Sequence, residues 1–87
     1  MLYEIENLQN ARRFLSTVDG AVTIRNPKGS TRYYGMRVID YMFRTLQKEF
    51  PHKISGVVVD AYDDYSAFVT ARQLGYADIL YTNRQVK

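Results

Sequence analysis

The chain has 87 residues, of which 46% are hydrophobic and 24% are charged, and its formal net charge is +3. This length fits one domain that buries about 60–70% of its surface on folding, and this composition excludes a disordered chain. The absence of cysteine excludes disulfides, thiolate nucleophiles and cysteine-bound metals, and we expect a cytoplasmic protein. The N-terminal sequence lacks the basic and apolar regions of a signal peptide. No apolar run exceeds three residues, so no membrane contact is expected.

The first predicted elements in chain order are a strand, a helix and a second strand. Residues 2–6 alternate between apolar and polar side chains, which is typical of a half-exposed edge strand, although a helical first turn fits nearly as well. Asn7 is a candidate N-cap for a helix over residues 8–18. The short apolar run over residues 21–24 predicts the next strand.

An irregular segment over residues 25–35 follows. It contains two turn-forming pairs, Asn26-Pro27 and Lys28-Gly29. Ser30 or Thr31 is the predicted cap of a long helix over residues 31–50. Pro51 ends that helix, because proline disfavours helical geometry in the residue before it.

The run Val57-Val58-Val59 is β-branched and too short for a helix. It predicts a strand over residues 54–60 that is covered on both faces, as in the centre of a parallel sheet. A helix over residues 64–74 should follow, with Asp63 or Asp64 as its N-cap and Gly75 just after its end. The run over residues 79–81 predicts a last strand.

This order predicts a single α/β domain over residues 1–87, with residues 82–87 as a frayed tail. The sheet should be mostly parallel, with three or four strands and three helices in two or three layers. Leu46, Val58 and Phe68 are the predicted core residues.

The predicted sheet brings two loops together, because ligands of open parallel sheets bind beyond the carboxyl ends of the strands. One is the basic loop over residues 25–35, and the other is the acidic segment over residues 60–65. Their side chains form the candidate site for a ligand or a small anion: Arg25, Lys28, Ser30, Thr31, Arg32, Tyr33, Tyr34, Asp60, Tyr62, Asp63, Asp64 and Tyr65.

Each loop has a functional and an ordinary interpretation. Backbone N–H groups after Gly29, with Lys28 and Arg32, could bind an anion at a helix start, but the spacing of a P-loop or of GxGxxG is missing. The ordinary alternative is a solvated connection with a Ser/Thr cap. The three aspartates could hold Mg²⁺, but one N-cap and one counter-ion for Arg25 or Arg32 explain them as well. We therefore predict no metal and no cofactor.

Familiar catalytic groups are not expected at this edge. His52, the single histidine, precedes the strand over residues 54–60 and so lies at the opposite end of the sheet. The basic residues and tyrosines over residues 25–37 would suit nucleic acid, but aspartates at the same edge would repel phosphates, so we do not expect a nucleic-acid partner.

The favoured hypothesis is a non-catalytic binding or protein-interaction module. One alternative is a small enzyme or a metal- or phosphate-binding domain that uses the carboxyl edge of the sheet. A second alternative is nucleic-acid binding through the loop of basic residues and tyrosines.

A thin sheet leaves two edges unpaired, so we expect a homodimer. Aromatic residues near the two termini, such as Tyr3 and Tyr81, are expected around those edges. Lys53, Arg84 and Lys87 would instead protect the edges of a monomer.

Between about residue 50 and residue 81, the chain has a strand ending in aspartate, an acidic turn, an alanine-rich helix ending in Leu-Gly, and a closing strand. The matching positions are Asp60, Asp63 or Asp64, Ala67, Ala71, Leu74 and Gly75. In these features the chain resembles certain short uncharacterised bacterial α/β proteins, which implies a fold but no activity. The pattern is also similar to STAS-type regulatory domains. Asp63-Asp64-Tyr65-Ser66 stands where that family has Asp-Ser-Ser/Thr-Gly, so no phosphoserine switch is implied.

Overall fold

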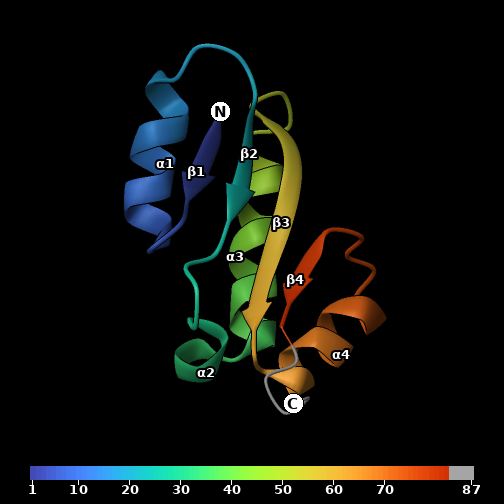
Figure 1. Cartoon of the computed structure of the whole chain (residues 1–87). Helices are drawn as coiled ribbons and strands as arrows, with labels where there is room; N and C mark the ends of the chain where they lie inside the picture. The colour runs from blue at the N-terminus through green and yellow to red at the C-terminus, as the bar shows by residue number, and fades with distance from the viewer. Residues whose placement is uncertain (83–87) are drawn as a thin grey trace.

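A computed structural model describes residues 1–82, so the expected frayed tail lies outside the described residues except for Thr82 (Figure 1). The elements are β1 (Leu2–Glu4), α1 (Leu8–Thr17), β2 (Val22–Arg25), α2 (Thr31–Tyr34), α3 (Met36–Glu49), β3 (Ile54–Tyr62), α4 (Tyr65–Gln73) and β4 (Ile79–Tyr81). This order confirms the predicted α/β fold. None of the helices in the described part of the chain is long and apolar enough to cross a membrane.

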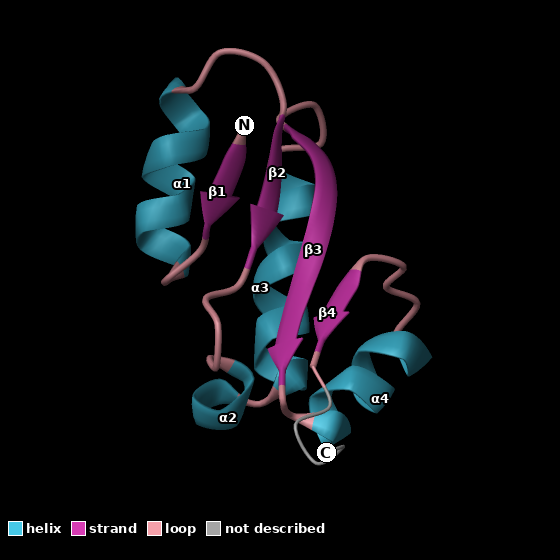
Figure 2. Ribbon diagram, in the orientation of Figure 1, coloured by secondary structure: helices cyan, strands magenta, loops and turns pink. Residues whose placement is uncertain are grey.

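The sheet is parallel throughout, and its strand order is β1-β2-β3-β4. Because neighbours in the chain are neighbours in the sheet, every crossover moves in the same direction. Right-handed crossovers then place the connecting helices on one face of the sheet. Figures 1 and 2 show α3 behind the strands and α1 beside β1, and the sheet and the helices on one of its faces form two layers.

The prediction that β3 is covered on both faces is wrong. Val59 faces the helices and is fully buried, whereas Val58 points to the other side of the sheet and is only half-buried. A β-branched run is compatible with either arrangement, and the strand order decides between them.

We call the side of the sheet without helices the open face. Its residues follow from the strand register and the alternation of side chains: Leu2, Glu4, Thr23, Arg25, Gly56, Val58, Asp60 and Leu80. Leu2 is 53% exposed and Leu80 is 48% exposed. The open face therefore presents apolar side chains to solvent on both edge strands, β1 and β4.

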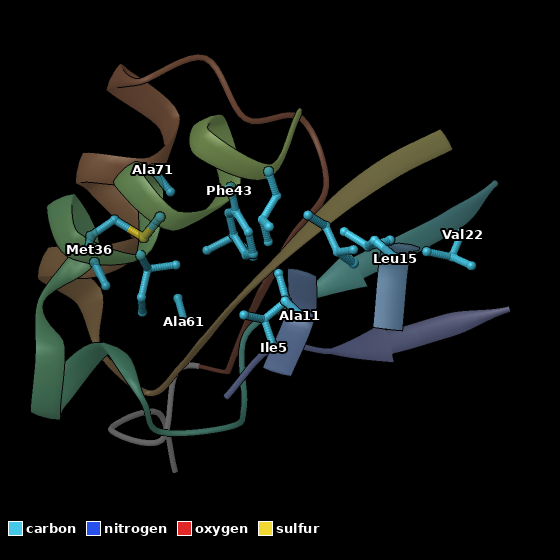
Figure 3. Packing of buried hydrophobic residues seen from close by; sticks show 13 residues of the cluster. Ile5, Ala11, Leu15, Val22, Met36, Phe43, Ala61 and Ala71 are labelled. Atoms are coloured by element: carbon cyan, nitrogen blue, oxygen red, sulfur yellow. The ribbon is translucent and has the colours of Figure 1, made fainter. Parts of the chain in front are cut away.

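The core lies between the sheet and the helices (Figure 3). Leu46 and Phe43 of α3 are fully buried there, which confirms the prediction for Leu46. Phe68 is only partly buried, so the prediction that it lies in the core was too strong. Its ring stacks on Tyr81 at 4.8 Å between ring centroids, and Tyr3 stacks on Phe14 in the same way at 4.1 Å. These aromatic side chains of the edge strands therefore contact helices.

The predicted helix over residues 31–50 is interrupted at Gly35, where φ is 82°. The left-handed conformation is open to glycine and ends the single turn of α2 before α3 begins. Ser30 does not cap α2 with its side chain, contrary to prediction. The caps of the other two helices are confirmed: Asn7 accepts from the Asn10 N–H at 2.8 Å, and Asp64 accepts from the Ala67 N–H at 3.2 Å.

A polar cluster joins α3 to the loop between α4 and β4. The Tyr76 hydroxyl donates to Asp40 at 2.5 Å, and Arg44 donates to Asp40 at 2.7 Å and to the Leu74 carbonyl at 2.9 Å. Burial, together with the hydrogen bond to Asp40, raises the pKa of Tyr76 above its usual range. The phenol therefore stays protonated and holds the loop against α3.

Candidate functional site

The two loops meet at the carboxyl ends of β2 and β3, and Asn26 joins them. Its side chain is buried, with Oδ1 accepting from the Asp60 N–H at 2.7 Å and Nδ2 donating to the Asp60 carbonyl at 2.9 Å. Nδ2 also donates to Ser30 Oγ at 2.9 Å. The amide thus pairs with the β3 backbone as a further strand residue would. Sequence reasoning treated Asn26 only as a turn residue, although its position directly after a strand was the available signal.

Both carboxylate oxygens of Asp60 form contacts within the chain. Oδ2 pairs with Arg25, and the two side chains are 7% and 21% exposed. Oδ1 accepts from the Tyr62 N–H at 3.0 Å. Tyr62 has φ of 50°, a region that few non-glycine residues adopt, and the hydrogen bond that its N–H donates to Asp60 supports that backbone. The Lys28 ammonium lies 4.4 Å from the centre of the Tyr62 ring, so it too contacts the acidic segment.

The other two aspartates are also paired. Arg32 forms an ion pair with Asp63 at 2.9 Å, and Thr31 donates to Asp64 at 2.9 Å while Asp64 caps α4. These are the contacts that the ordinary interpretation of the acidic segment names, in which aspartates cap a helix and balance arginines. Within residues 1–82, no group of three or more acidic or histidine side chains could hold a metal ion.

The turn after Gly29 uses some of the backbone N–H groups of the predicted anion site. The Arg32 N–H donates to the Gly29 carbonyl at 3.2 Å, and the Tyr34 N–H donates to the Ser30 carbonyl at 3.0 Å. The Ser30 N–H likewise donates to the Pro27 carbonyl at 3.0 Å, and anion binding at this turn stays a prediction.

The tyrosines of the candidate site do not converge. Tyr33 is 86% exposed and points to solvent, and Tyr34 is also exposed. Tyr65 lies on α4 with its ring centre 5.9 Å from that of Tyr81. His52 lies in the turn before β3, at the end of the sheet opposite to the two loops, as predicted. A ligand contact by the exposed members of the set stays a prediction.

Two small cavities lie near this edge. One, of about 250 Å³, lies between the start of α3 and α4, with Arg37, Ser66 and Thr70 among its lining residues. The other, of about 220 Å³, lies against the basic loop, between Lys28 and Tyr33. Both are smaller than the roughly 300–1,000 Å³ that is typical of small-molecule sites, so neither indicates an organic substrate.

No family model matches the chain, and no solved structure matches it. The chain is 45% identical over 80 residues to Uncharacterized protein RP547 of Rickettsia prowazekii (strain Madrid E). The alignment covers 92% of this chain and 76% of that relative. The resemblance to short uncharacterised bacterial proteins is thereby confirmed over most of the chain. No family model supports the similarity to STAS-type domains.

Proposed function

Because the chain belongs to the family of Uncharacterized protein RP547, whose name states no activity, we propose from the geometry that it is a small non-catalytic module that binds another protein surface. The observation that carries this proposal is the pairing of the aspartates at the carboxyl edge with Arg25, Arg32 and Thr31. Carboxylates whose oxygens accept from arginine and threonine side chains are engaged within the chain rather than directed at a substrate proton. The cysteine-free sequence supports a cytoplasmic location, which is part of the proposal.

The open face is the surface that we propose for this contact. It exposes Leu2 and Leu80 around the half-buried Val58. It also carries both signs of charge, with the half-exposed Glu4 only 3.9 Å from Arg25. A two-fold dimer needs a self-complementary surface, and such a face can place Glu4 of each copy near Arg25 of the other. We therefore propose a second copy of the chain as the partner.

The size of the open face sets the strength of this association. Strands of 3, 4, 9 and 3 residues form the sheet. With a rise of about 3.3 Å per residue and a strand spacing of about 4.8 Å, the sheet projects onto about 300 Å². Stable interfaces bury about 800 Å² on each partner, so the flanking loops must contribute. We expect a weak dimer with a dissociation constant in about the micromolar range.

Leu80→Lys will shift the chain towards the monomer, because it places a charge in the apolar part of the open face. The matched control is Val38→Lys, since Val38 is 47% exposed but belongs to α3 on the other side of the sheet. Light scattering coupled to size exclusion, over a dilution series, measures the mass of both variants. A mass of one chain for the unmodified protein at every concentration would refute self-association through this face.

A thermal-shift screen separates this module from the alternative of a small enzyme or a phosphate-binding domain. Ligand at one hundred times its dissociation constant adds about 2.7 kcal/mol to stability, which raises the melting temperature of a small domain by about 10 °C or more. We expect phosphate, nucleotides and Mg²⁺ to produce no such rise. A rise that disappears in Asp63→Asn would instead favour the alternative. Asp63 suits this test better than Asp60, whose removal would disturb the loop itself.

A further inference from the structure

Positive and negative charges are separated between the two layers of the molecule. The helices α1, α3 and α4 carry six basic and two acidic residues, while the remainder of residues 1–82 carries four basic and seven acidic ones. Both acidic residues of these helices are already paired: Glu49 with Arg12 at 2.8 Å and Asp40 with Arg44 at 2.7 Å. The outer side of the helices is therefore strongly basic.

The exposed basic side chains of α1 and α3 form what we call the helix-layer surface: Arg12, Arg13, Arg37, Arg44 and Lys48, together with Tyr41. Among the described residues, Arg13, Arg37 and Lys48 have no carboxylate within ion-pair distance. Tyr41 is 64% exposed and lies about one helical turn after Arg37. The Arg12–Glu49 pair connects the two helices, so these cations stand on a rigid support.

The basic loop differs from this surface, because its cations are already engaged. Arg25 pairs with Asp60, Arg32 pairs with Asp63, and Lys28 lies over the ring of Tyr62. Arg13, Arg37 and Lys48 are therefore unpaired cations that lie together on α1 and α3, whereas the other basic side chains without an ion pair in residues 1–82, Lys28, Lys53 and Arg72, are separate and contact an aromatic ring or a backbone carbonyl.

We propose that the helix-layer surface binds duplex DNA through its phosphates. A basic stripe along a helix in a chain of isoelectric point about 9.3 is the electrostatic footprint of nucleic-acid binding. Arg37, Arg44 and Lys48 recur along one side of α3, so their charges form a row that can follow a line of phosphates. Single strands are held by several stacking rings, whereas Tyr41 is the exposed ring of these two helices.

Among duplexes, the surface fits DNA better than RNA. The major groove of B-DNA is wide enough to admit a helix between its two rows of phosphates, whereas that of an RNA helix is deep and narrow. The acidic segment, from which the sequence predicted repulsion, lies at the carboxyl edge of the sheet and is paired there. This DNA contact goes beyond the proposed function, because it uses the helices rather than the open face.

Fluorescence anisotropy of a labelled DNA duplex tests the proposal. Three phosphate contacts predict a slope of about −2.7 in the logarithm of affinity against the logarithm of salt concentration, a loss of about 40-fold between about 50 and 200 mM salt. Arg13→Gln with Lys48→Gln should lower the steepness of this slope by about two units. The control pair, Lys28→Gln with Arg32→Gln, removes the same charge from the basic loop and should leave DNA binding unchanged. Circular dichroism will check that both double variants are folded.

Three outcomes would overturn the proposal. The first is the absence of duplex binding at about 50 mM salt and up to about 100 µM protein, the weak end of non-specific affinity. The second is an equal loss in the two double variants, which would show an effect of net charge alone. The third is tighter binding of a single strand, of an RNA duplex or of polyglutamate at the same salt concentration. DNA binding and the dimer use different surfaces. Leu80→Lys changes the open face and leaves the helix-layer surface intact, so this variant tests DNA binding without the dimer.

Discussion

Asn26→Ala will lower the free energy of unfolding by about 2–5 kcal/mol. The substitution removes the partners of the Asp60 N–H and carbonyl, both of which are buried at the end of β3. Each buried polar group left without a hydrogen bond costs about 1–3 kcal/mol. Urea denaturation followed by circular dichroism measures the change. For a domain of this size, each kcal/mol also corresponds to about 4–8 °C in melting temperature.

Asn10→Ala is the matched control for this substitution, because Asn10 is exposed on α1 and takes part in the N-cap only through its backbone N–H, which donates to Asn7 Oδ1. We expect its effect to stay within about 0.5 kcal/mol. A loss below about 1 kcal/mol for Asn26→Ala would contradict the bridging role of the amide. It would mean that water reaches the backbone of Asp60.

Leu46→Ala will cost about 2–5 kcal/mol, because it leaves a cavity between α3 and the sheet. Val58→Ala should cost about 1 kcal/mol or less, because Val58 is half-buried on the open face. Both unfolding free energies should be measured at a concentration where light scattering shows a monomer. Equal costs there would contradict a core on one side of the sheet.

The sequence alone placed most of the helices and strands correctly, because their signals are local. The N-cap asparagine before α1 and the β-branched run of β3 act on their immediate neighbours, so no distant residue is needed to read them. The break at Gly35 was missed because Ser30 and Thr31 are typical helix caps and the apolar spacing of α3 begins directly after Gly35, at Met36. Gly35 has no Cβ and can adopt either a helical or a left-handed backbone, so only the surrounding fold selects the left-handed one.

The sequence also determined that the basic and acidic loops share one edge of the sheet, since parallel strands end on the same side. It could not determine the partner of each charge: Arg25 and Asp60 are 35 residues apart in the chain, and their contact depends on β2 lying beside β3. The strand order likewise decided that all the main helices cover one face, because a right-handed crossover has a defined side only once the next strand has a position. The open face and the basic helix-layer surface both follow from that order, which no local pattern of residues encodes.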